Sequence, residues 1–146
     1  MLRRERDGYR LRLGRDEREL LARLARELRD LVVDDQADPS LERLFPPASA
    51  DARDAADFDR LVRSSLVATK THALATLERT AGEERLTGQE LEQWLVALND
   101  LRLVLGTRLG VTEDLDERRY AEPGVGLYAW LTWLQATVIE AVAGEL

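Results

Sequence analysis

One strip of an apolar segment carries polar residues whose types and spacing could do chemistry. Asn99, Arg102 and Gly106 recur at helical spacing, and Asp100 lies beside them. Arg102 falls on a face otherwise made of leucines, where an unpaired charge would be very costly. The favoured interpretation is an internal Arg–Asp or Arg–Glu brace that fixes the helix register. The alternative is a pocket for an anion or a partner's carboxylate, to which Gly106 permits close approach.

Other catalytic and metal-binding sets are missing from the sequence. The chain has no cysteine and one histidine, which excludes thiolate chemistry, disulfides and a histidine metal cluster. His72 has Thr69 three residues before it, so the Glu-x-x-His pattern of a carboxylate-bridged metal site is absent. Glycine-rich nucleotide loops and Gly-x-Ser-x-Gly elbows are also absent. We therefore predict a protein that is not an enzyme and that needs no metal or cofactor.

The N-terminal segment carries an excess of positive charge. Residues 1–15 hold six arginines against Glu5 and Asp7, a net of +4, while the whole chain has a net charge of −7. Arg4, Arg6 and Arg10 are therefore candidate contacts for a partner. The arm could touch phosphates, but the overall negative charge makes nucleic acid an unlikely partner. Neutralisation within the molecule, or docking to an acidic protein, explains the pattern equally well.

Two tryptophans near the C-terminus form the last candidate site. Trp130 flanks the apolar stripe of the final predicted helix, and Trp133 lies farther round toward its polar side. Either this helix is wrapped by its neighbours, or the pair anchors an interface, where tryptophan is enriched. The sequence does not decide between these interpretations.

These residues must be positioned by helices. Apolar and charged residues alternate at 9–13, directly after the turn signal Asp7-Gly8, and this pattern predicts a small β-hairpin. The first helix is expected to begin with a cap at Asp16, supported by Glu19, and to end near residue 33. The further helices are expected over a short segment at 38–45, then over 51–79, 87–110 and 123–143. We expect an all-α bundle of four to five helices in a single domain, with a basic hairpin arm (1–14) and a helical bundle (16–143).

Two of the predicted helices carry specific signals. Thr87 with Glu90 forms a capping box, and Gly110 occupies the position of a left-handed C-terminal glycine. The segment between them is apolar all round, which predicts the buried central helix. The preceding helix is expected to bury one continuous stripe, made of Phe58, Leu61, Val62, Leu66, Thr69, Ala73 and Leu77.

Neither a secretion signal nor a membrane span is predicted. The N-terminus is charged where a signal peptide needs an apolar region. The uncharged run from Pro123 to Ile139 is 17 residues long, at the edge of membrane-spanning length, but it contains Gln135 and two glycines. A buried core helix is the better interpretation, and we expect a cytoplasmic protein. The sequence does not predict its oligomeric state.

Three stretches resemble a known family. They are the run WLVALNDLRLVLGTRL at 94–109, Leu44-Phe45-Pro46, and YAWLTWLQ at 128–135. Together they resemble an actinobacterial uncharacterised-domain family whose members are described as oxidative-stress transcriptional regulators. The resemblance implies regulation by protein contact, including association with an alternative sigma factor. Some members are described as sensing oxidants through cysteines, which cannot apply to a chain that has none.

Three functional hypotheses follow from the residues and the resemblance. The primary one is a cytoplasmic, non-enzymatic regulator that binds a sigma factor or another transcription component through a helical face. Its expected contacts are Asn99, Asp100, Arg102, Trp130, Trp133, Arg4, Arg6 and Arg10. The second is a regulator that binds DNA through its basic arm. The third is an enzyme with an unrecognised pocket around Asn99, Asp100 and Arg102.

Overall fold

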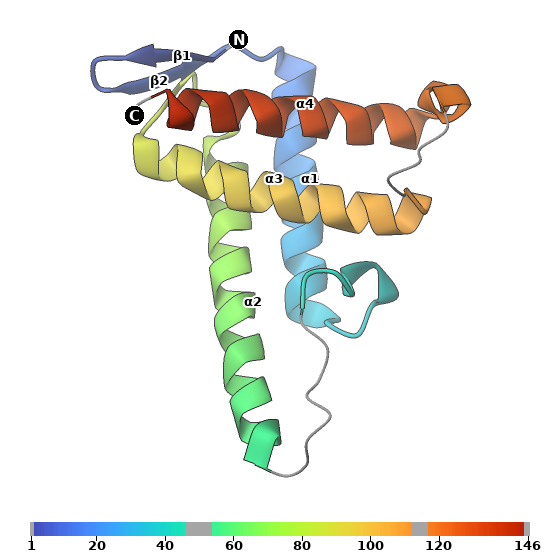
Figure 1. Ribbon diagram of the computed structural model, residues 1–146. Coiled ribbons are helices and arrows are strands. Elements are labelled where there is room, and N and C mark those ends of the chain that lie inside the picture. The colour runs from blue at the N-terminus through green and yellow to red at the C-terminus, as the bar shows by residue number, and fades with distance from the viewer. Residues whose placement is uncertain (1, 46–53, 112–116, 145–146) are drawn as a thin grey trace.

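Four α-helices and a small antiparallel sheet make up the described part of the chain, as the sequence predicts (Figure 1). The structure is a computed structural model that describes residues 2–45, 54–111 and 117–144. The elements are β1 (Leu2–Glu5), β2 (Gly8–Leu11), α1 (Arg15–Asp34), the 3₁₀ turn η1 (Pro39–Leu41), α2 (Asp54–Thr80), β3 (Arg85–Leu86), α3 (Gly88–Leu109), the 3₁₀ turn η2 (Glu117–Ala121) and α4 (Pro123–Ala143).

The helices form two crossed pairs. α1 and α2 run side by side, and α3 and α4 lie across them as a second pair (Figure 1). The core fills the space between the pairs, because α3 turns its most apolar side toward α1 and α2. Leu91, Trp94 and Leu98 are completely buried there. The indole Nε1 of Trp94 donates to Thr80 Oγ1 of α2 at 2.7 Å, so the polar atom of this buried ring is satisfied.

Local sequence signals define both ends of α3. The Glu90 N–H donates to Thr87 Oγ1 at 3.1 Å, and the Thr87 N–H donates to Glu90 Oε1 at 2.9 Å, which confirms the capping box. Gly110 has a φ of 66°, and the Val111 N–H donates to the Gly106 carbonyl at 2.9 Å. This left-handed ending is the one expected of a glycine at that position.

The start of α1 differs from the prediction. The N-cap is Gly14, whose N–H donates to Glu17 Oε1 at 2.8 Å, so the cap expected at Asp16 with Glu19 is wrong. Arg18 in the first turn of this helix is held by four backbone carbonyls. It donates to the carbonyls of Leu11 at 2.6 Å, Leu13 at 3.1 Å, Ala81 at 3.0 Å and Glu83 at 2.7 Å. Arg18 reaches these groups because the helix has already begun one residue before Asp16.

The predicted hairpin forms, and it gains a third strand that the sequence did not predict. β2 lies between β1 and the two-residue β3, with Tyr9 opposite Leu86. Both of these side chains are buried. Gly8 has a φ of 146°, and a Cβ at this position would lie 2.4 Å from the Leu86 carbonyl oxygen. Only glycine lets the two strands approach so closely.

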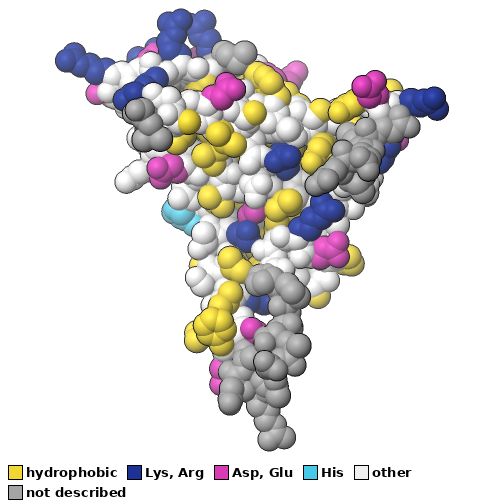
Figure 2. Space-filling model, in the orientation of Figure 1, with side chains coloured by type: hydrophobic (Ala, Val, Ile, Leu, Met, Phe, Trp, Pro, Cys, Tyr) yellow, Lys and Arg dark blue, Asp and Glu magenta, His cyan; other side chains and the backbone are white. Residues whose placement is uncertain are grey.

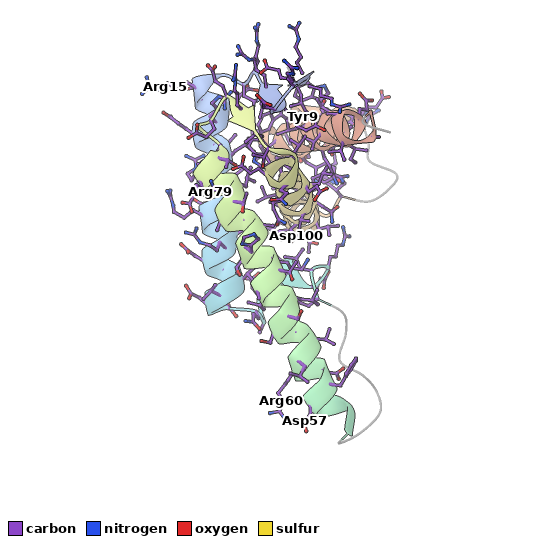
Figure 3. All side chains as sticks on the ribbon, turned by 90° about the vertical axis from the view of Figure 1, so that its left-hand side faces the viewer. Tyr9, Arg15, Asp57, Arg60, Arg79 and Asp100 are labelled. Atoms are coloured by element: carbon purple, nitrogen blue, oxygen red, sulfur yellow. The ribbon has the colours of Figure 1, made fainter. Side chains whose placement is uncertain are left out.

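The apolar stripe expected along α2 is buried over only part of its length. Ala73 and Leu77 are fully buried, whereas Phe58 is 66% exposed and Leu61 is 70% exposed. The prediction is wrong at these two positions because the N-terminal part of α2 extends past the end of α1 (Figures 1 and 3). It is also wrong at Thr69, which is exposed. The predicted helix start at residue 51 lies outside the described residues, and the helix is described from Asp54.

α4 is a surface helix with one buried side. Leu131, Leu134 and Val138 face the core, and the helix packs along α3. Among the described residues, α4 alone is long and apolar enough to cross a membrane, with a mean hydropathy of 1.2. The expectation of a core helix is met on the inner side only, because much of the remaining surface of α4 is exposed.

Candidate functional site

Arg102 joins α3 to α4 through neutral groups. Its Nε donates to Thr132 Oγ1 at 3.0 Å and its Nη1 to Gln135 Oε1 at 2.5 Å. Its Nη2 lies 3.4 Å from the Tyr128 hydroxyl, and the guanidinium carbon lies 5.5 Å from the centre of the Tyr128 ring. The expected brace therefore exists, but its partners are not the Asp or Glu that the sequence suggested. Within the described residues, no carboxylate forms an ion pair with Arg102.

A second arginine lies next to this contact. At Gly106, one turn beyond Arg102, an added Cβ would lie 3.2 Å from Tyr128 Cε2 and 3.8 Å from Arg43 Nη1. Because Gly106 has no side chain, the Tyr128 ring and the Arg43 guanidinium can both lie close to α3. The expectation that Gly106 permits close approach is met by these two groups of the chain itself. We call Arg43, Arg102, Gly106 and Tyr128 the arginine site. Sequence reasoning missed Arg43, because it follows η1 and only the fold brings it to α3.

The buried ion pair of this region belongs to Asp100. Lys70 Nζ of α2 lies 3.0 and 3.2 Å from the two carboxylate oxygens of Asp100. The Asp100 side chain is 2% exposed and the Lys70 side chain 14%. Burial raises the pKa of Asp100, and the Lys70 ammonium opposes this rise. Lys70 is the only lysine in the chain, a signal that could have marked it as a residue with a special role.

Asn99, Asp100 and Arg102 do not converge on one pocket. Asp100 points to α2, as Figure 3 shows, and Arg102 points to α4. Asn99 is half-buried between these two directions on the helix. A shared acid, base and oxyanion arrangement would need these side chains to meet around one substrate. The described residues also contain no group of three metal-binding side chains.

The exposed side of α4 is mostly uncharged, with Glu140 in the last turn as its one charged residue. Thr132, Trp133, Ala136 and Ile139 are exposed there, Trp133 at 41% and Ile139 at 48%. We call these four residues the outer face of α4. At 100° per residue, this face adjoins the edge that carries Tyr128 and Gln135, so it borders the arginine site. In Figure 2 the side on which α3 and α4 lie shows hydrophobic side chains beside basic ones.

The two candidate tryptophans differ in their surroundings. Trp133 belongs to the outer face of α4, whereas Trp130 is half-buried against the core. The sequence left open whether these tryptophans are covered by neighbouring helices or exposed. In the structure Trp130 is partly covered and Trp133 is exposed. Only Trp133 has the exposure that a contact residue needs.

The basic arm is partly neutralised by its own strands. Arg10 Nε lies 2.8 Å from Glu5 Oε1, and Arg85 Nε of β3 lies 3.5 Å from Glu5 Oε2. Arg4 and Arg6 are exposed. The hairpin lies at the end of the molecule where α3 begins and α4 ends (Figure 1). The arm residues and the arginine site are therefore separate features.

A cavity of about 250 Å³ separates α1 from the second half of α3. Its walls are apolar, with Leu28 and Leu105 among them, and Leu131 of α4 closes one side. Glu27 and Arg108 supply its polar atoms. None of the contact residues predicted from the sequence lines this cavity.

Comparison with known families decides what kind of chain this is. The family model described as "Domain of unknown function (DUF2017)" matches residues 1–142. The chain belongs to the DUF2017 family. The resemblance noted in the sequence is thereby confirmed, since the matched range contains all three stretches that carry it.

One curated relative matches this DUF2017 chain. It is a Mycobacterium leprae protein named "Putative oxidative stress regulator AosR", 33% identical over 127 residues. The match covers 72% of the present chain and 58% of the relative, so the chain spans just under six-tenths of the relative's length. No solved structure matches the chain.

Proposed function

We propose that this protein is a cytoplasmic, non-enzymatic regulator that acts by binding a protein of the transcription machinery, with a sigma factor as the expected partner. The observation that carries the proposal is the outer face of α4. The helix has no charged residue from Pro123 to Ile139, although 34% of the chain is charged and one side of this helix faces solvent. The one charge of α4, Glu140, lies in its last turn, and a surface helix that is otherwise uncharged is the expected form of a face that a partner covers.

The residues on this face suit a protein interface. Trp133 presents a large aromatic ring at 41% exposure, and Ile139 extends the apolar surface by a further turn and a half. Tryptophan is enriched among the residues that dominate binding energy. Thr132 and Ala136 between them are small, so a partner's side chains can approach the helix closely.

The relative supports the regulatory part of the proposal. The name of the Mycobacterium leprae protein describes it as an oxidative stress regulator, and 33% identity links it to this chain. The present chain has no cysteine, so it cannot respond to oxidants through a thiol of its own. A binding role is compatible with that constraint, because it needs no reactive group.

The proposal is tested with purified RNA polymerase core and purified alternative sigma factors of the source organism. The immobilised full chain is compared with Trp133→Glu, and Leu61→Glu is the matched control because it adds the same charge at an exposed apolar residue of α2. We expect one of these proteins to bind the unmodified chain and Leu61→Glu equally, and Trp133→Glu about tenfold more weakly. Equal binding by all three chains, or binding by none, would overturn the proposal.

Direct DNA binding by the arm is the second candidate, favoured by the exposure of Arg4 and Arg6. It predicts binding to duplex DNA that weakens steeply with salt. Arg4→Glu and Arg6→Glu should abolish it. Without a mobility shift at low salt this candidate is ruled out, and the ion pair between Arg10 and Glu5 already reduces the positive charge available for it.

A further inference from the structure

The guanidinium of Arg102 is oriented by the protein and still has binding capacity. Three of its donor atoms contact Thr132, Gln135 and Tyr128, all of them neutral. Arginine has five N–H donors, so two remain for a ligand. These neutral contacts fix the plane of the group without neutralising its charge. Lys70 of α2 differs, because Asp100 of α3 neutralises it.

Arg43 brings a second positive charge to the same place. Its Nη1 and the edge of the Tyr128 ring both lie over Gly106. Arg43 is exposed, and it makes no ion pair with the described residues. Two guanidiniums thus flank Tyr128 in a protein whose net charge is −7. An arrangement of this kind is stable when an anion from outside the chain joins it, because charge-assisted hydrogen bonds to arginine are among the stronger ones.

We propose that the arginine site binds a carboxylate of an acidic segment in the protein partner. The inference rests on the proposed function, and it specifies the partner's chemistry: Asp or Glu next to apolar residues. The apolar residues would lie on the outer face of α4, which borders the site, and the carboxylate would accept from Arg102 and Arg43. The planar guanidinium matches a carboxylate in a two-bond arrangement. Nucleic acid is disfavoured, since a phosphate backbone needs a broad basic surface.

The test is a titration of the full chain, labelled at arginine side chains, followed by the Nε–H signals in NMR spectra. The probes are an octaglutamate peptide, an octaglutamine peptide of equal length, and an oligothymidylate. We expect octaglutamate to shift the Arg102 and Arg43 signals in a saturable way, and octaglutamine to leave them unchanged. Failure of octaglutamate to shift either signal, or tighter binding of the oligothymidylate at the same arginines, would overturn the inference.

Variants test whether the two arginines act together. Arg102→Gln and Arg43→Gln should each weaken octaglutamate binding about fivefold. Arg102→Lys, which keeps the charge but loses the planar fork, should fall between Arg102→Gln and the unmodified chain. Arg23→Gln is the matched control, because Arg23 is an exposed arginine of α1 without an ion pair among the described residues. An equal loss in Arg23→Gln would show general attraction by charge and overturn the proposal.

The same variants separate this inference from the proposed function. Trp133→Glu should keep octaglutamate binding while it loses the transcription protein. If Arg102→Gln and Arg43→Gln bind that protein as well as the unmodified chain does, the acidic contact is wrong and the docking role of α4 stands. The thermal unfolding temperature of each variant is compared with that of the unmodified chain, so that a loss of binding can be told from a loss of folding.

Discussion

Replacing Lys70 with methionine leaves the Asp100 carboxylate buried without its counter-ion. The two oxygens of Asp100 lie 3.0 and 3.2 Å from Lys70 Nζ, and the Asp100 side chain is 2% exposed. Removing one partner of a buried ion pair costs about 3 to 5 kcal/mol of unfolding free energy. Because Lys70 keeps 14% of its side-chain exposure, we expect a loss near the lower end, about 3 kcal/mol.

The pH dependence of this loss has a definite sign. Burial raises the pKa of Asp100, with Lys70 in opposition, so Lys70→Met should raise this pKa further. A carboxyl whose pKa is higher in the folded state binds its proton more tightly there, so the folded state gains stability as the pH falls through that pKa. The cost of Lys70→Met should therefore be smaller near pH 5 than at neutral pH.

Urea denaturation, followed by tryptophan fluorescence, to which the buried Trp94 ring contributes, measures this cost. The companion variant is Lys70→Met with Asp100→Leu, in which both charges are gone. We expect it to recover most of the lost stability, because replacing both members of a buried pair with apolar residues is often neutral. A single-variant cost below about 1 kcal/mol that is equal at both pH values would refute the reasoning.

Three further predictions concern single positions; the first two are measured by the urea midpoint against the unmodified chain and the third by hydrogen exchange. Thr80→Val leaves the buried Nε1 of Trp94 without an acceptor and should cost about 1 to 3 kcal/mol; an unchanged midpoint would contradict this. Gly110→Ala should cost about 1 kcal/mol because of the left-handed φ, since open space surrounds the position; an unchanged midpoint would argue against that backbone conformation. Gly8→Ala should separate β2 from β3, because its Cβ would strike the Leu86 carbonyl, and hydrogen exchange in the hairpin should speed up; unchanged exchange would contradict the register.

The predictability of α3 comes from the local nature of its signals. Thr87, Glu90 and Gly110 act within one turn of their own helix end, so the sequence alone contains the cause of each boundary. The start of α1 has a local signal in the bond between Gly14 and Glu17, but it also has contacts that are not local. Arg18 is held by carbonyls at Ala81 and Glu83, more than sixty residues away in the chain.

In the candidate site, too, local features could be predicted from the sequence and distant contacts could not. Periodicity placed Arg102 and Gly106 on one strip and predicted that Arg102 would brace the helix. It could not identify the partners, which lie thirty residues away on α4. Nor could it show that Asp100 pairs with Lys70 on a different helix. The two residues are 200° apart around α3, so each meets another neighbour.

The error at Phe58 and Leu61 has another origin. An apolar stripe shows which side of a helix can be buried, but it does not reveal where the neighbouring helix ends. α2 is 27 residues long and α1 is 20, so part of the stripe extends beyond its partner. The outer face of α4 has a similar cause. Its uncharged residues indicate a surface that can be buried, but they do not tell whether this chain or another protein covers it.

The contacts of Arg18 also set the order in which the chain can be completed during synthesis. β1 and β2 are made before β3, but β2 pairs with β3 at residues 85–86 and Arg18 is anchored at residues 81 and 83. A two-stranded hairpin is marginal alone in water. The hairpin must therefore wait until residues 81–86 have been synthesised before it finds its final place. Until then the arginines of the arm stay accessible, and the hairpin becomes ordered only with β3.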